Sequence, residues 1–112
     1  MLRVFNLPWF LAKKEVFHWL MCGQKTIDIR KGKPKSGNIA VFQSGLNVWR
    51  LKIVKTEVGL LSEILHLDNF KSVIPSALEL EEVVSYLRRI YGACDGVFTA
   101  YYVEPIVSCG KG

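Results

Sequence analysis

The most regular pattern of apolar and polar positions lies near the end of the chain. Between Leu80 and Tyr91, apolar residues recur every three or four positions, with acidic residues at the start of the segment and arginines near its end. This spacing puts the apolar side chains on one face of an α-helix, and the charges suit the helix dipole. Ser76 and Glu79 have the spacing of a capping box, and Gly92 is typical of a helix end. The pattern predicts a helix that begins after Ser76 and ends at Gly92.

Two more helices are predicted from the same spacing. The segment from Leu11 to Cys22 carries a cluster of apolar residues, with lysines and a glutamate on the solvent side, and Gly23 ends it. A shorter apolar cluster predicts a helix from Leu60 to Leu67. The residues from Asp68 to Pro75 are expected to form a connector.

Alternation of apolar and polar residues predicts the strands. In the longest of them, Trp49, Leu51 and Ile53 are expected to face the core. The last strand is apolar on both faces and is therefore expected to be central, with Tyr101 and Tyr102 on opposite faces. The predicted strands are Arg3 to Leu7, Thr26 to Arg30, Ile39 to Phe42, Val48 to Lys55 and Val97 to Val103.

The order of these elements predicts an α+β fold, with antiparallel strands that could close into a small barrel. A length of 112 residues fits a single domain, residues 1–112, with a flexible tail at about residues 106–112. Half of the residues are apolar and 22% are charged, which argues against disorder. The formal net charge of +5 favours an anionic partner such as RNA or DNA.

The cysteines and histidines exclude several classes of protein. Cys22, Cys94 and Cys109 stand alone, which is typical of reduced thiols in a cytoplasmic protein. His18 and His66 lie far apart, so no metal site and no cofactor are expected. Pro8 breaks the apolar start of the chain, and no stretch reaches the about 18 uncharged residues of a membrane span. We therefore expect a cytoplasmic protein without a membrane partner.

Positive charges gather just after the predicted strand that ends at Arg30. Lys31, Lys33 and Lys35 follow it in a loop with two glycines and a proline, and all four cations are candidates to bind phosphates. The alternative interpretation is a flexible basic loop that serves solubility alone. Trp9, which follows a proline near an exposed turn, is the best candidate to stack on a base.

The strand itself carries two candidate chemical groups. Asp28 lies two residues before Arg30, on the same strand face, where an ion pair would aim the guanidinium at a phosphate or a base edge. Lys25 lies beside a helix end, where partial desolvation would lower its pKa and make it a possible base or nucleophile. Ordinary charges on a solvated strand face are the alternative.

An ordered set of motifs resembles the signature of the ASCH domain, a family within the PUA-like barrels. A glycine, a Lys-Thr pair and an arginine-ended strand are followed by a second glycine and an apolar strand. A helix that ends Leu87-Arg88-Arg89-Ile90-Tyr91-Gly92 is frequent in small ASCH proteins. The matching residues are Gly23-x-Lys25-Thr26-x-x-x-Arg30 and Ser36-Gly37-Asn38-x-x-x-Phe42.

The resemblance implies a small β-barrel of about five to six mostly antiparallel strands with two to three flanking helices. It also implies RNA binding, in a cleft beside the Lys-Thr strand. Some family members are hydrolases, either an amidohydrolase of acetylated cytidine or a metal-dependent ribonuclease. In the amidohydrolases the lysine that matches Lys25 is catalytic; Asp28 stands at the position of their threonine, and Ser76 near that of their glutamate.

Three hypotheses follow from the sequence. The first is an RNA-binding domain with a basic cleft. The second is a small hydrolase acting on RNA or on a modified nucleoside, with Lys25 as its catalytic residue. The third is a protein-interaction module with a basic surface. For the first, the expected contacts to nucleic acid are Lys25, Thr26, Asp28, Arg30, Lys31, Lys33, Lys35 and Trp9.

Overall fold

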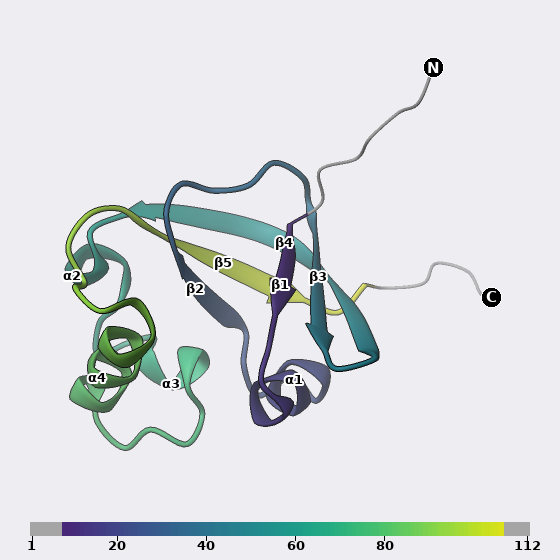
Figure 1. Ribbon diagram of the computed structural model, residues 1–112, viewed down its shortest axis with the longest axis horizontal. Helices are drawn as coiled ribbons and strands as arrows, with labels where there is room; N and C mark the ends of the chain where they lie inside the picture. Colours follow the sequence, from purple (N-terminus) through teal and green to yellow (C-terminus); the bar gives the residue numbers. More distant parts are fainter. Residues whose placement is uncertain (1–7, 107–112) are drawn as a thin grey trace.

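Five strands form one curled, mixed sheet in the order β1-β3-β4-β5-β2 (Figure 1). The structure is a computed structural model that describes residues 8–106. The pairing of β1 with β3 is parallel and the other three pairings are antiparallel. The predicted α+β fold is confirmed, with the sheet forming a half-barrel. The strands are β1 (Trp9–Leu11), β2 (Ile27–Lys31), β3 (Ile39–Ser44), β4 (Asn47–Gly59) and β5 (Phe98–Glu104).

The curl of the sheet comes from the long strand β4. Its first half, up to Lys52, pairs with β3, and its second half pairs with β5. A register shift between Ile53 and Lys55 interrupts the second ladder, and an irregularity of this kind bends a strand. One strand therefore serves two ladders, which leaves β1 and β2 as the edges of the half-barrel.

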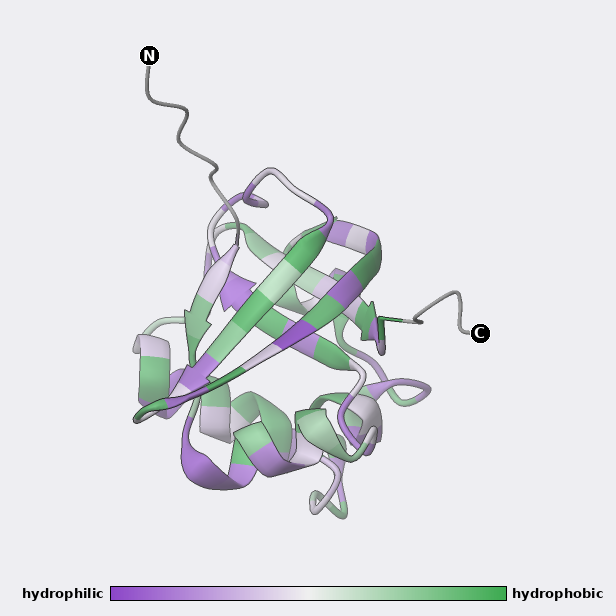
Figure 2. Ribbon diagram, turned by 90° about the vertical axis from the view of Figure 1, so that its right-hand side faces the viewer, coloured by the Kyte–Doolittle hydropathy of each residue, from purple (hydrophilic) through white to green (hydrophobic). Residues whose placement is uncertain are grey.

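The helices cover the two faces of the sheet with separate cores. Phe17 and Leu20 of α1 pack on the inner face, against a cluster that includes Phe42 and Tyr101. The other three helices pack on the outer face, and Figure 2 shows helices below the strands. The helices are α1 (Lys14–Met21), α2 (Leu61–Ile64), α3 (Phe70–Val73) and α4 (Leu80–Tyr91).

Strand β5 is central, as its apolar composition predicts. It pairs with β4 on one side and β2 on the other. Tyr101 is buried in the inner core, whereas Tyr102 packs against the outer core and donates a hydrogen bond to Glu57. The two tyrosines lie on opposite faces, as predicted, and a strand covered on both faces is typically a nearly continuous apolar run.

The start of the chain differs from the prediction. The predicted strand from Arg3 to Leu7 lies outside the described residues, and a strand runs instead from Trp9 to Leu11, where a helix was expected to begin. The N–H of Val41 donates to the carbonyl of Pro8 at 2.8 Å, so the ladder to β3 starts at the proline. A proline carbonyl still accepts, which is why Pro8 borders the strand on this side.

The predicted capping box at Ser76 is wrong. Helix α4 has Glu79 as its N-cap, and the Glu82 carboxylate accepts the N–H of Glu79 at 2.9 Å. The N–H of Ala77 donates to Ile74, so Ser76 lies in a turn ahead of the helix. The reciprocal glutamate of a capping box is therefore Glu82, three residues after the predicted Glu79.

Two further details were not predicted. Trp49 pairs with Phe42 and so shares the expected inner face, yet 38% of it is exposed because it lies near the hairpin end of β4. The connector contains α3, which follows the buried side chain of Asn69; this side chain donates to Ile64 and accepts the N–H of His66. The described residues thus form four helices, one more than predicted, and two of them, α2 and α3, are single turns. No helix within residues 8–106 is long and apolar enough to cross a membrane.

Candidate functional site

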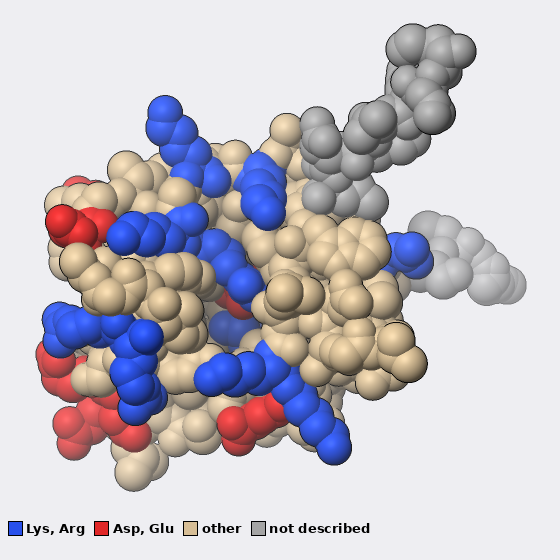
Figure 3. Space-filling view, in the orientation of Figure 1, with Lys and Arg blue, Asp and Glu red and all other residues tan. Residues whose placement is uncertain are grey.

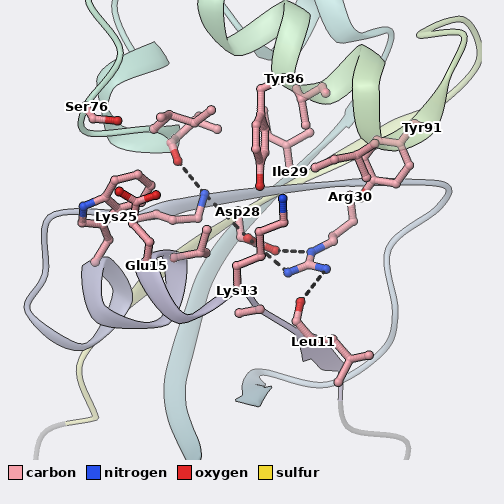
Figure 4. A pocket seen from close by; sticks show the side chains of 17 residues that line it. Leu11, Lys13, Glu15, Lys25, Asp28, Ile29, Arg30, Ser76, Tyr86 and Tyr91 are labelled. Atoms are coloured by element: carbon pink, nitrogen blue, oxygen red, sulfur yellow. Dashed lines mark hydrogen bonds and ion pairs between the residues drawn. The ribbon is translucent and has the colours of Figure 1, made fainter. Parts of the chain in front are cut away.

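A cleft of about 380 Å³ opens between α1, α4 and the edge strand β2. Apolar and aromatic side chains from the two helices form its walls, among them Trp19 and Tyr86. Lys25, Asp28 and Arg30 line it together (Figure 4). The three residues that the sequence singled out for chemistry therefore meet in one place, and we refer to them as the floor of the cleft.

Lys25 is held by the end of α1 and by two carbonyls. Gly23 has a φ of +82°, which turns the chain out of the helix, and the N–H of Lys25 donates to Trp19 at 3.1 Å. The ammonium donates to the carbonyls of Ile27 at 2.7 Å and Val73 at 2.6 Å. The first belongs to an edge strand and the second to a helix end, places where carbonyls lack a regular partner. Lys25 thus joins β2 to α3.

Burial changes the protonation of this lysine. Lys25 is 6% exposed, and burial lowers its pKa from 10.5 to about 8, although the nearby Asp28 charge acts in the opposite direction. Its ammonium lies 3.6 Å from the nearer oxygen of Asp28. With this pKa, about a tenth of the Lys25 side chains are neutral at pH 7. The sequence prediction of a desolvated lysine is confirmed.

Asp28 and Arg30 form the ion pair expected from their spacing. The Arg30 Nε donates to the buried carboxylate at 2.6 Å, and Nη2 lies 3.4 Å from its second oxygen. The third guanidinium nitrogen, Nη1, donates to the carbonyl of Leu11 at 3.2 Å. Leu11 ends β1, so Arg30 connects the two edge strands of the half-barrel. The Phe10 ring lies beneath the guanidinium, 4.5 Å from its carbon.

The loop from Gly32 to Asn38, called the basic loop below, is fastened to the sheet. The N–H of Gly32 donates to Val97, and its carbonyl accepts the Thr99 hydroxyl, both at 2.7 Å. Further along, the N–H of Lys35 donates to the Tyr101 hydroxyl at 3.0 Å. These bonds set the path of the loop, which counts against the alternative of a freely flexible segment.

The basic loop and the cleft meet at one aromatic ring. The Lys35 ammonium lies 5.2 Å from the centroid of Phe10, the same ring that carries the Arg30 guanidinium. Figure 3 shows Lys and Arg side chains around a hollow on this face, with positive and negative groups visible inside it. On this face, Lys and Arg side chains therefore surround the mouth of a cavity.

Not every predicted contact residue lines the cleft. Lys33 and Lys35 lie on the basic loop outside it. Lys31, at the end of β2, also lies outside it, and its ammonium donates to the carbonyl of Ala93. Thr26 is exposed and its backbone pairs with Ser72 and Val103. Trp9 also lies outside the cleft; its indole N–H donates to Gln43 at 2.9 Å and 48% of the residue is exposed.

Sequence reasoning missed several lining residues. Lys13 and Glu15, expected only to face solvent, lie at the cleft, and Lys13 is 5.4 Å from the Tyr86 ring across it (Figure 4). Tyr86 and Tyr91 lie on α4, where helical spacing alone does not separate a core position from a cleft wall. Ser76, which was expected to cap the helix, lines the cleft as well.

No group of three or more His, Cys, Asp and Glu residues within residues 8–106 is placed to hold a metal ion. No protein-family model matches the sequence. A search of curated proteins finds no match either. Among solved structures, the crystal structure of a hypothetical protein, PH0355, is similar, with a TM-score of 0.70 and 24% sequence identity over 89% of this chain and 100% of that one. This likeness concerns the fold alone.

Proposed function

We propose that this protein is an RNA-binding domain of the ASCH type, which holds one nucleoside unit of a single strand in the cleft. The observation that carries the proposal is the ring of Lys and Arg side chains around a cavity with a polar floor (Figure 3). A cavity of about 380 Å³ lies within the usual range for small-ligand sites, which begins at about 300 Å³. We also propose that the protein is located in the cytoplasm.

The two parts of the site have different tasks in this proposal. The cleft walls offer aromatic surface for a base, and stacking on aromatic side chains is common to proteins that bind single strands. Lys33 and Lys35 on the basic loop, with Lys31 beside them, face the phosphates that flank the bound unit. Trp9 offers a half-exposed ring to a further base. The fixed path of the basic loop favours binding, since less ordering is needed when RNA arrives.

The test is the affinity for a fluorescently labelled single-stranded RNA at rising salt concentration. The logarithm of the affinity should fall linearly with the logarithm of the salt concentration, because bound phosphates release counterions. Lys33→Glu should weaken binding and reduce the slope by about 1 or more. Lys52→Glu is the matched control: it makes the same change of charge on β4, where Lys52 already lies beside Glu104. An affinity that does not change with salt concentration, or an equal loss of affinity in both variants, would contradict the proposal.

A second candidate is the hydrolase on RNA or a modified nucleoside. It is favoured by the Lys25 amine, whose lowered pKa leaves a neutral fraction near neutral pH. If the two carbonyls keep two of its hydrogens, the lone pair of the neutral amine is directed away from both. The wild type should then hydrolyse acetylated cytidine or RNA, with a rate that rises as the pH passes about 8. Lys25→Met should abolish turnover, and an unchanged rate in that variant would exclude Lys25 as the catalytic residue.

The third hypothesis, a protein-interaction module, becomes an outcome of the RNA experiment. A protein that binds neither RNA nor a nucleoside, yet keeps its fold, would leave the basic face to an acidic protein partner. We favour RNA because the charges surround a cavity with aromatic walls, whereas a protein partner does not require such a cavity.

A further inference from the structure

The floor of the cleft presents hydrogen-bond donors that no other group within residues 8–106 uses. A guanidinium has five N–H groups. Among the described residues, Arg30 uses one on Nε and one on Nη2 for Asp28, and one on Nη1 for Leu11. One N–H therefore remains on each terminal nitrogen. Arg30 lines the cleft and is partly exposed, so these two groups are within reach of a ligand.

Lys25 adds a positive charge beside these donors. Its ammonium has three N–H groups, of which the carbonyls of Ile27 and Val73 take two. The nearer oxygen of Asp28, at 3.6 Å, forms an ion pair with the same ammonium. The Asp28 carboxylate is 4% exposed and both of its oxygens face Arg30. A group that reaches the floor therefore meets donors.

The orientation of the guanidinium is fixed on several sides. Asp28 holds one edge, Leu11 holds Nη1, and the Phe10 ring lies under the plane. A guanidinium that is held in this way selects a ligand by the positions of its acceptors as well as by its charge, because the planar fork matches two adjacent acceptors. A flexible lysine at this place would not make that distinction.

We infer that Arg30 determines which base enters the cleft, and that the cleft selects bases with two adjacent acceptors on one edge. Cytosine has such an edge in O2 and N3, and guanine in O6 and N7. The N–H of uracil between its two carbonyls, and the amino group of adenine beside N7, would place a donor against the donors of the floor. This inference rests on the proposed function, since it names the unit that the RNA-binding cleft accepts.

A phosphate is the competing ligand for the same two N–H groups. The walls favour the base. Trp19, Tyr86 and Ile90 line the cleft, and most of the surface that they offer is aromatic or apolar, against which a phosphate would lose water at a cost. A flat base buries both faces against such walls and still reaches the floor with its edge. Phosphates have other partners in the basic loop outside the cleft.

The test measures the affinities of the full-length protein for cytidine, guanosine, uridine and adenosine, which contain no phosphate. The wild type should bind cytidine or guanosine, or both, about tenfold to a hundredfold more tightly than uridine and adenosine, as expected for one bidentate contact. The comparison of the two favoured nucleosides shows which of them the cleft accepts. Arg30→Lys should remove most of this preference, whereas Arg50→Lys, on β4, should keep it.

A second measurement does not depend on a variant that folds. In the wild type, the Arg30 Nε–H resonance should shift when cytidine or guanosine is added, and inorganic phosphate should not reproduce the shift. Equal affinities for all four nucleosides would overturn the inference but not RNA binding, provided that RNA still binds in a salt-dependent manner. Competition by inorganic phosphate as strong as that by the favoured nucleoside would overturn it too. If neither nucleosides nor RNA bind, both proposals fail.

Discussion

The buried amine of Lys25 makes the stability of the protein depend on pH in a specific direction. Its pKa is about 8 in the folded protein and 10.5 in the unfolded chain, and burial is the main cause. Between these values the unfolded chain binds more protons than the folded state, so the free energy of unfolding rises with pH. Below pH 8 both states are protonated and the full cost of burying the charge is present.

The size of the effect follows from the two pKa values. At about 1.4 kcal/mol for each pKa unit, burying the charged form costs about 3 kcal/mol. Relative to pH 7, this cost should be reduced by about 1 kcal/mol at pH 9 and by between about 2 and 3 kcal/mol at pH 10. Lys25→Met keeps the length of the side chain and removes the titrating group, so the variant should lack this contribution.

The assay is urea unfolding of both proteins at pH 7, 8, 9 and 10, followed by tryptophan fluorescence. The difference in unfolding free energy, wild type minus Lys25→Met, should increase as the pH rises. Taking the difference cancels the titration of tyrosines and cysteines, which both proteins share. Lys14→Met, an exposed position on α1, is the control and should give a difference that is constant with pH. A constant difference for Lys25→Met as well would refute the reasoning.

The remaining predictions concern the neighbours of this amine and the basic loop. Asp28→Asn should destabilise the protein by about 3 to 5 kcal/mol at pH 7 in urea unfolding, because two cations lose their shared buried anion. In the same variant the pKa of Lys25 should fall below about 8, since the Asp28 charge raises it. Tyr101→Phe removes the hydroxyl that accepts the Lys35 N–H; it should cost about 1 kcal/mol and speed hydrogen exchange at that amide. An unchanged exchange rate would mean that the hydroxyl does not hold the loop.

Local signals predicted those parts of the fold and site that depend on neighbouring residues. The two-residue spacing of Asp28 and Arg30 predicted a shared strand face, and their ion pair follows from that spacing. The apolar run from Val97 to Val103 predicted a central strand, because a strand covered on both faces needs such a run. The position of Lys25 after a helix and a glycine predicted its desolvation.

Contacts between distant segments were not accessible to this reasoning. The carbonyl of Val73 that binds Lys25 is 48 positions away, and any residue supplies a carbonyl, so the sequence carries no mark of it. The same holds for the carbonyl of Leu11 that binds Arg30. Trp49 has the alternation of a core residue, but its exposure depends on where its strand extends beyond the helices. Tyr86 has a helical position that suits a core and a cleft wall equally.

The most direct test of the account is a backbone amide NMR titration of the full-length protein with a short single-stranded RNA. The account predicts shifts that cluster at the floor of the cleft, around Asp28 and Arg30, at Tyr86 on its wall and along residues 32–38 of the basic loop. Amides in the exposed β3–β4 hairpin, around Leu46, should not shift. Shifts confined to that hairpin, or no shifts at RNA concentrations well above that of the protein, would contradict it.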